Sequence, residues 1–364
     1  RLSVNFRDDP LDRHDVNFDG SYGAVAFGNW MLFAGRVEQW WGPGWDSALL
    51  LSNNARPMPL IGLGRLEAKP FESRWLRWIG PWNLRMFAGR KSKNRNDFPH
   101  PFEVGYRVDF QPTRWMSWGL TYMVQFCGQG RPCSFTSIRK AVLPFPNQTN
   151  TRANKNRLQN DPGDAQAGWD VSFQGTLAGL GWTLYTEQAF EDQIEDTIAL
   201  YGATLTGRTG LLGGAQWRFV GEMADTFGDR TSIVFRKSKG QPFIYQNSIF
   251  TDGPTYRGRI LGASLDFNSL LVTGRLMLQF DAGPSWELMV RHADINRPEA
   301  GGSIRPHLIS ANRERINILE TRLIWPTERF GQIRLEAGLA DDAPNTPGRS
   351  PTKGRVEVGW SYGF

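Results

Sequence analysis

The segment at residues 355–364, RVEVGWSYGF, decides the fold class, because apolar and polar side chains alternate along its whole length. Valine and aromatic side chains share one face of the segment: Val356, Val358, Trp360, Tyr362 and Phe364. Alternation with a period of two residues predicts a β-strand with one apolar and one polar side. The same alternation recurs at residues 104–110, 118–126, 169–173, 216–223, 286–292 and 333–340, so strands are predicted along most of the chain.

Three features favour a transmembrane barrel over a soluble β-sandwich as the source of these strands. The segments run for about 9 to 11 residues, the length at which a tilted strand crosses a bilayer. The polar face mixes arginine with acidic residues, which suits a lumen where opposite charges pair. Tryptophans recur at segment ends, as interfacial girdles require: Trp82, Trp115, Trp182, Trp325 and Trp360. We predict an all-β fold, a transmembrane antiparallel up-and-down β-barrel of about 16 to 18 strands, as a single domain over residues 1–364.

Short and long connections alternate between the predicted strands. Short turns are expected near residues 28–29, 111–113, 177–181, 281–284 and 326–331. Long connections are expected at 9–19, 41–59, 91–100, 128–166, 225–270, 294–313 and 341–354. This alternation is typical of periplasmic turns and extracellular loops, with residues 68–81 as a longer stretch on the periplasmic side. The weakly alternating segment RILGASLDF is either a further strand or a hairpin folded into the mouth.

The composition argues against several other classes of protein. The chain has 364 residues, with 15 tryptophans and 23 phenylalanines, but no run approaches the roughly 18 apolar residues of a membrane helix. The net charge of +6 is scattered among acidic residues, so we expect no nucleic-acid partner. The chain starts at Arg1 without a charged and then apolar leader, so we expect a mature or trimmed form or a protein that is not exported.

The two cysteines, Cys127 and Cys133, lie in the stretch CGQGRPC with no histidine beside them. Close spacing around glycines predicts a small disulfide loop at the base of the longest connection, in an oxidising compartment. A zinc site is not expected, because two thiolates without further ligands do not complete a tetrahedral site.

The stretch DVNFDG at residues 15–20 matches the start of a calcium-binding loop, with Asp15, Asn17 and Asp19 as weak candidate ligands. Ala26 stands where the acid that closes such a loop should be, and a simple Asx turn explains the same residues without a metal. The four histidines lie on separate segments without a nucleophile motif. We therefore expect no catalysis, no cofactor and no metal.

Arginines on the polar face of the strands are candidate lumen charges: Arg85, Arg107, Arg218, Arg275, Arg291 and Arg322. They could line a selective pore. They could equally pair with acidic neighbours such as Glu222, Glu287 and Glu336, and so help to fill a lumen that does not conduct. The sequence leaves both interpretations open.

The stretch WWGPGWDSALLLSNNARP at residues 40–57 combines aromatic and amide side chains in one predicted loop. Aromatic faces stack on sugar rings, while amide and guanidinium groups bind hydroxyls and carboxylates. Candidate polysaccharide-binding residues are therefore Trp40, Trp41, Trp45, Asn53, Asn54 and Arg56. The alternative is a loop that packs its tryptophans inside the barrel mouth, and residue types alone favour that alternative.

The segment GNWMLFAGRVEQWWGPGWDSALLLSNNARPMP resembles the signature of the Wzi family of outer-membrane capsule-assembly proteins, and GPWNLRMFAG, FVGEMADT and FIYQNSIFTDG resemble later parts of it. The resemblance covers most of the chain. It implies an outer-membrane barrel of a Gram-negative bacterium that acts as a lectin for surface polysaccharide and helps to anchor or assemble a capsule. Family members carry a helical bundle before the barrel, whereas this chain begins at the strand segment RLSVNF.

Two functions from different classes follow. The leading hypothesis is a surface lectin without catalysis that contacts extracellular polysaccharide, together with outer-membrane lipid and lipopolysaccharide, as a monomer. The alternative is a porin or channel with an arginine-rich lumen. Conductance in planar bilayers separates the two hypotheses, because ohmic openings are expected of the channel alone.

Overall fold

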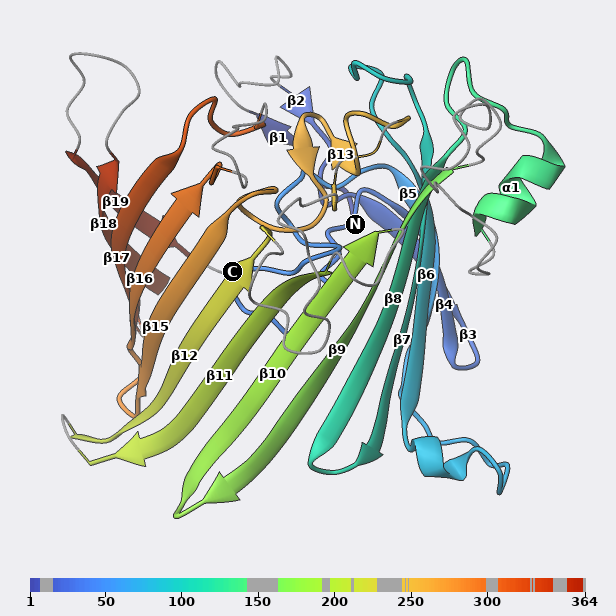
Figure 1. The fold of residues 1–364 in the computed structure, drawn as a ribbon. Helices are drawn as coiled ribbons and strands as arrows, with labels where there is room; N and C mark the ends of the chain where they lie inside the picture. The colour runs from blue at the N-terminus through green and yellow to red at the C-terminus, as the bar shows by residue number, and fades with distance from the viewer. Residues whose placement is uncertain are drawn as a thin grey trace.

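The computed structural model describes residues 1–6, 16–142, 163–191, 197–210, 213–227, 244–245, 247, 249–298, 307–327, 329, 331–342 and 352–362. These residues form an all-β protein built around one antiparallel sheet (Figure 1). Strands that are neighbours in the sheet follow one another in the chain among the sheet strands, which is the up-and-down connectivity predicted from the sequence.

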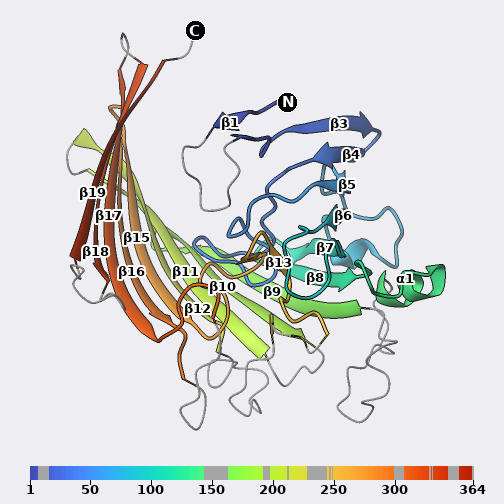
Figure 2. The same cartoon turned by 90° about the horizontal axis from the view of Figure 1, so that it is seen from above.

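The sheet has fifteen strands. Their bounds are β3 (Tyr22–Phe27), β4 (Trp30–Gly35), β5 (Leu60–Arg65), β6 (Trp82–Arg90), β7 (Phe102–Thr113), β8 (Met116–Phe126), β9 (Gly163–Leu177), β10 (Leu180–Glu191), β11 (Thr197–Thr209), β12 (Ala215–Asp225), β15 (Leu270–Phe280), β16 (Ser285–Ile295), β17 (Glu314–Thr327), β18 (Gly331–Asp342) and β19 (Thr352–Ser361). The strands β3 and β19 are its two edges, and within the described ranges no ladder joins them. Figure 2 shows the sheet curling around the segments inside it.

Fifteen strands are one fewer than the lower bound of the predicted count, and two short ladders lie outside the sheet. Near the N-terminus, β1 (Asn5–Phe6) pairs only with β2 (Val16–Asn17), outside the sheet. The weakly alternating segment contributes β14 (Arg259–Ile260), which pairs with β13 (Thr255–Tyr256). Positive φ angles at Arg257 and Gly258 turn the chain between them, so this segment is the hairpin folded into the mouth and not a further strand.

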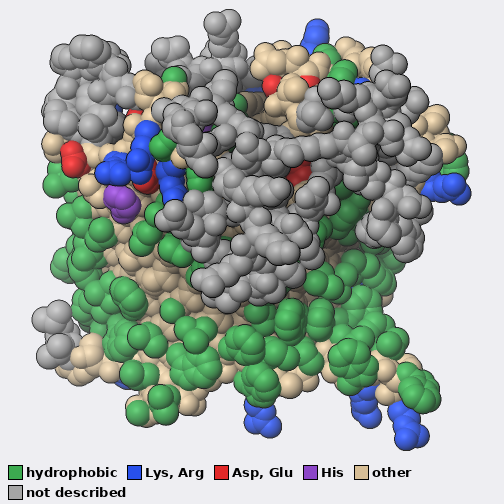
Figure 3. Space-filling view, viewed as in Figure 1, with side chains coloured by type: hydrophobic (Ala, Val, Ile, Leu, Met, Phe, Trp, Pro, Cys, Tyr) green, Lys and Arg blue, Asp and Glu red, His purple; other side chains and the backbone are tan. Residues whose placement is uncertain are grey.

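The outward face of the sheet is apolar, as the alternation predicts. In β19, the exposed fractions of Val356, Val358 and Trp360 are 80%, 70% and 69%. Cross-strand pairing places Leu205 of β11 beside Phe219 of β12 on the same outward face. Apolar side chains form a belt over the lower half of the strands in Figure 3. An apolar belt of this kind is the surface that a bilayer solvates.

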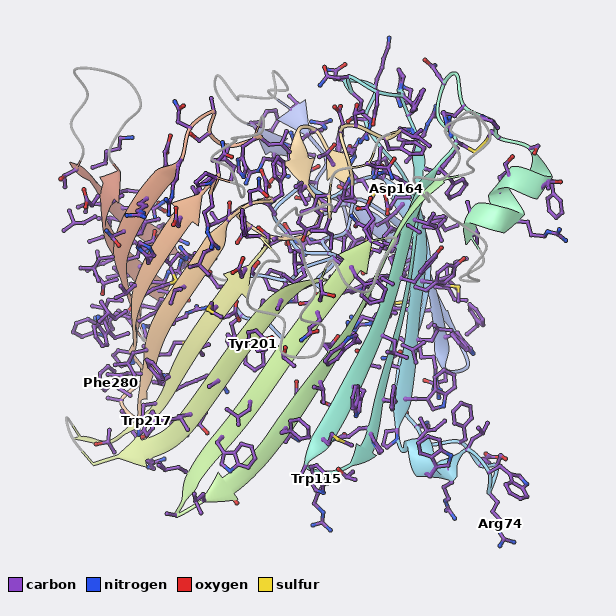
Figure 4. All side chains as sticks on the ribbon, viewed as in Figure 1. Arg74, Trp115, Asp164, Tyr201, Trp217 and Phe280 are labelled. Atoms are coloured by element: carbon purple, nitrogen blue, oxygen red, sulfur yellow. A yellow bond between two sulfur atoms is a disulfide. The ribbon has the colours of Figure 1, made fainter. Side chains whose placement is uncertain are left out.

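Connection length separates the two ends of the sheet (Figure 1). At the turn end, strands are joined by short turns such as residues 178–179 and 281–284. Residues 68–81 also lie there and contain the 3-10 helix η1 (Arg77–Ile79). The predicted tryptophan girdle lies at this end, where Figure 4 labels Trp115 together with Trp217 and Phe280. The described residues that begin and end the longer connections, and α1 (Phe135–Val142), lie at the opposite loop end.

The hydrophobic core lies inside the curve of the sheet, around residues 41–58, which we call the inward segment. Connection length predicted an outside position for this segment, whereas residue types favoured packing inside the mouth. The structure agrees with the second prediction, because the segment leaves β4 at the loop end and folds back between the strands (Figure 2). Trp41 and Leu49 are 1% and 0% exposed. Burial of this apolar run against Leu200, Ile244 and Ile260 removes from water a surface that an external loop would expose.

Candidate functional site

Glu222 of β12 holds the start of the inward segment. Its buried carboxylate accepts hydrogen bonds from three successive backbone amides: Trp45 at 2.6 Å, Asp46 at 3.1 Å and Ser47 at 2.9 Å. The hydroxyl of Tyr185 donates a fourth, at 2.9 Å. Each of these donors would otherwise be buried without a partner, so the carboxylate also fixes the position of the backbone that carries them.

Two glycines allow the inward segment to approach the wall of the sheet. Gly44 lies so close that an added Cβ would be 2.0 Å from the carbonyl oxygen of Ser47 and 3.2 Å from Oε2 of Glu222. At Gly42, φ is 147° and an added Cβ would be 2.5 Å from Oε2 of Glu187. The other oxygen of Glu187 accepts the amide of Leu49 at 3.0 Å. The glycines in WWGPGW therefore place backbone against two glutamates, which no residue with a Cβ could do without displacement.

Asp46 fixes the inward segment to the two strands that follow β12 in the sheet. Its carboxylate accepts the hydroxyl of Thr273 in β15 at 2.6 Å and the Nε–H of Arg291 in β16 at 2.8 Å. The guanidinium of Arg291 also reaches Glu320 of β17 at 3.0 Å. Burial alone would raise the pKa of Asp46, but the hydrogen bonds and positive charge of Arg291 outweigh it and hold that pKa below its usual value of 3.8.

Asp46→Asn should loosen the inward segment at neutral pH by about 1–3 kcal/mol, because Arg291 loses its charged acceptor. A depressed carboxyl pKa stabilises the folded segment above the unfolded value of 3.8, and that stabilisation is lost as the pH falls through the folded pKa. Hydrogen exchange of the amides of residues 45–49, corrected for intrinsic rates, measures both effects. The wild type should lose protection toward acid more steeply than Asp46→Asn. Equal protection of the two proteins at pH 7 would contradict the prediction that Asp46 holds the inward segment in place.

The second half of the inward segment binds the connection after β12. Ser52 donates its amide to the carbonyl of Leu261 at 2.7 Å. The side-chain amide of Asn54 donates to the carbonyl of Ile260 at 3.0 Å and to the carboxylate of Asp266 at 3.0 Å. The hydroxyl of Tyr245 donates to the carbonyl of Leu49. Residues 41–58 and 244–268 thus form one packed unit within the sheet.

The structure does not bring the six predicted polysaccharide-binding residues together on one surface. Trp41 is buried against Phe87, with ring centroids 5.2 Å apart. Trp40 donates its indole N–H to the carbonyl of Gly44 at 3.0 Å. Arg56 pairs with Asp19 at 2.6 Å, Asn54 is bound as described above, and Asn53 is exposed. Trp45 differs from the others, because the residue is 39% exposed and lines the turn-side part of the lumen.

Five of the six predicted lumen arginines are paired. The pairs are Arg85–Asp109 at 3.2 Å, Arg107–Asp170 at 2.8 Å, Arg275–Glu287 at 2.8 Å, Arg291–Glu320 at 3.0 Å and Arg322–Glu336 at 2.6 Å. The sixth, Arg218, lies over the ring of Trp45 at 4.9 Å. This arrangement matches the lumen of paired charges that the sequence left as one of two interpretations.

Two adjoining cavities of about 780 and 760 Å³ lie in the lumen on the turn side of the inward segment. Both are lined by Thr176, Gly181, Thr206 and Arg218, so we treat them as one turn-side chamber. Sequence reasoning missed this chamber. Its threonines and glutamines are ordinary polar positions in alternating strands, and only the register shows that they converge.

The remaining predicted sites are structural where the structure describes them. Cys127 and Cys133 are joined in a disulfide beside α1. Asp15 lies outside the described residues, and Asp19, a second calcium candidate, is engaged by Arg56. In the described part of the chain, no three acidic, histidine or cysteine side chains are grouped to share a metal ion. None of the helices described has the length and apolar character that crossing a membrane requires.

Comparison with known proteins gives matches to the family that the sequence resembles. Residues 1–342 match the family model for the capsule assembly protein Wzi. A Klebsiella pneumoniae protein described as an uncharacterized 55.8 kDa protein in the cps region is 35% identical over 179 residues, which are 49% of this chain and 34% of that protein. The solved structure of Escherichia coli Wzi, described as a carbohydrate-binding outer-membrane β-barrel involved in group 1 capsule assembly, superimposes with a TM-score of 0.74 at 23% identity. That alignment covers 95% of this chain and 71% of the Escherichia coli chain.

Proposed function

This chain belongs to the Wzi family of capsule assembly proteins, and from that premise we propose that it is an outer-membrane protein that binds surface polysaccharide and helps to hold it at the cell. The apolar outward face and the tryptophans at the turn end support a place in the membrane. Binding, and not catalysis, is proposed, with the loop end facing outward.

The inward segment is the observation that carries a binding role over a channel. Residues 41–58 occupy the interior of the curved sheet and are held by Glu222, Glu187 and Arg291 from three different strands. Ion flow would require this buried segment to leave its place. A barrel filled in this way serves as a rigid support for its loops.

The loop end carries a fixed polar surface that fits a polysaccharide. Arg95 pairs with Asp97 at 2.7 Å and donates to the carbonyls of Gly253 and Thr255, each at 2.9 Å, which joins residues 91–100 to the connection after β12. Lys93, Asn94 and Asn96 remain exposed on this joined surface. Ammonium and amide groups held by ordered backbone can bind acidic and hydroxyl groups of a glycan without the entropy cost of ordering a loop.

The test measures retention of polysaccharide extracted from the surface of the source bacterium by the purified barrel in detergent. Wild-type protein should bind saturably, and Lys93→Glu should bind about three- to tenfold more weakly at low salt. Arg74→Glu, the same charge reversal at the turn end (Figure 4), is the matched control and should bind as the wild type does.

Conductance is recorded on the same preparations in planar bilayers. The proposal expects retention of polysaccharide without steady ohmic openings. Openings without retention would overturn it in favour of the channel alternative. Heat-modifiable migration on gels reports for each variant whether the barrel is folded.

A further inference from the structure

Arg218 is unlike the other lumen arginines, because no carboxylate lies within 4.0 Å of it in the described part of the chain. It projects from β12 into the turn-side chamber, and its side chain is exposed there. None of the described residues that line the second cavity is acidic, and Arg114 adds a second positive residue. The cavity lined by Trp45 therefore presents positive charge without an acidic lining residue, and Glu287, which lines the other cavity, is paired with Arg275. This charge distribution favours an anionic occupant.

Trp45 supplies an aromatic surface where the same chamber meets the inward segment. Its backbone is fixed by Glu222 at 2.6 Å, and one part of its ring is covered by the guanidinium of Arg218. The guanidinium of Arg218 lies over the ring, and the N–H groups at its edge can still donate hydrogen bonds to a carboxylate. The exposed part of the indole is available for the apolar face of a sugar ring.

Hydroxyl and amide groups line the wall beside Trp45 and Arg218. Cross-strand pairing sets Gln174 of β9 opposite Thr183 of β10, and Thr183 opposite Thr204 of β11. The next row toward the turn end runs from Thr176 through Gly181 to Thr206 and Arg218. The hydroxyls of Thr176 and Thr183 make no side-chain hydrogen bond with the described residues, so they can bind the hydroxyls of a ligand.

We propose that the turn-side chamber binds a saccharide unit that carries a carboxylate. In this arrangement Arg218 binds the carboxylate, Trp45 stacks on the ring, and the threonine rows bind ring hydroxyls. Each cavity has the volume of a small-molecule site. The inference deepens the proposed function and rests on it, since it assigns a second contact with acidic polysaccharide to the lumen, separate from the surface around Lys93.

Isothermal titration calorimetry of the full chain in detergent tests the inference, with a disaccharide of galacturonic acid as the probe. The two comparison ligands are a neutral disaccharide of galactose and, in a separate titration, acetate. Both are measured at equal ionic strength. We expect the acidic disaccharide to bind at least tenfold more tightly than either. Arg218→Gln and Trp45→Leu should each weaken its binding about tenfold or more, while Arg218→Lys should be intermediate and Trp45→Phe close to the wild type.

Arg85→Gln is the matched control, because it removes a lumen arginine that is paired with Asp109 and is not among the residues lining the chamber. It should leave binding of the acidic disaccharide unchanged. No binding heat, equal affinity for acetate, or wild-type affinity in Arg218→Gln would each overturn the inference. The protein can fail this test and still retain extracted polysaccharide in a way that Lys93→Glu weakens. In that case the proposed function stands and the inference alone fails. Loss of both would reject the proposed function as well.

Discussion

Glu222→Ala should release the inward segment and open the lumen to ions. The substitution leaves the amides of Trp45, Asp46 and Ser47, together with the hydroxyl of Tyr185, without their acceptor. Buried donors without partners cost about 1–3 kcal/mol each, and partial access to water in the turn-side chamber lowers the sum, so we expect a loss of about 3–5 kcal/mol in the free energy that holds the segment. A loss of that size raises the open population by about a factor of a thousand.

Planar-bilayer conductance and hydrogen exchange of residues 45–49 measure this opening together. Glu287→Ala is the matched control, because Glu287 faces the same lumen but pairs with Arg275 and not with the inward segment. It should leave both readouts as in the wild type. If Glu222→Ala behaves as Glu287→Ala does, while both barrels migrate as folded, the carboxylate is not what holds the segment in place.

The strands could be predicted from the sequence because their signal is local. Alternation along residues 355–361 is a property of neighbouring residues, and the register pairs Val356, Val358 and Trp360 with apolar residues of β18, on the one face that this pattern requires. The turn-end position of the tryptophans follows from the same local pattern, since each stands where an alternating segment meets a turn.

Residue types favoured packing of residues 41–58 inside the mouth, but the residues that hold this segment could not be predicted, because they are distant in sequence. Trp45 is 177 residues from Glu222, and Leu49 is 138 residues from Glu187. A run of tryptophan, glycine and leucine is compatible with an exposed binding loop and with a packed interior. Only the register of β10 and β12 shows that two glutamates meet its backbone. The turn-side chamber was missed for the same reason, since its rows of threonines are assembled across strands.

Trp41→Ala should destabilise the inward segment without touching the saccharide site. The indole is 1% exposed, packs on Phe87, and lies over Gly105, where an added Cβ would be 2.9 Å from its ring. Truncation of a buried aromatic side chain leaves a cavity and costs about 3–5 kcal/mol. We therefore expect protection of the amides of residues 45–51 to fall by at least about a hundredfold.

Trp41→Phe gives a sharper form of this prediction. Within the described residues the indole N–H of Trp41 is buried without a hydrogen-bond partner, so phenylalanine removes an unsatisfied donor while it keeps most of the packing. It should cost clearly less than alanine. The companion Trp45→Leu should show the reverse pattern, with amide protection kept and binding of the acidic disaccharide weakened. If Trp41→Ala instead abolishes saccharide binding while protection stays as in the wild type, Trp41 is a ligand-binding residue and the burial seen here does not describe its role.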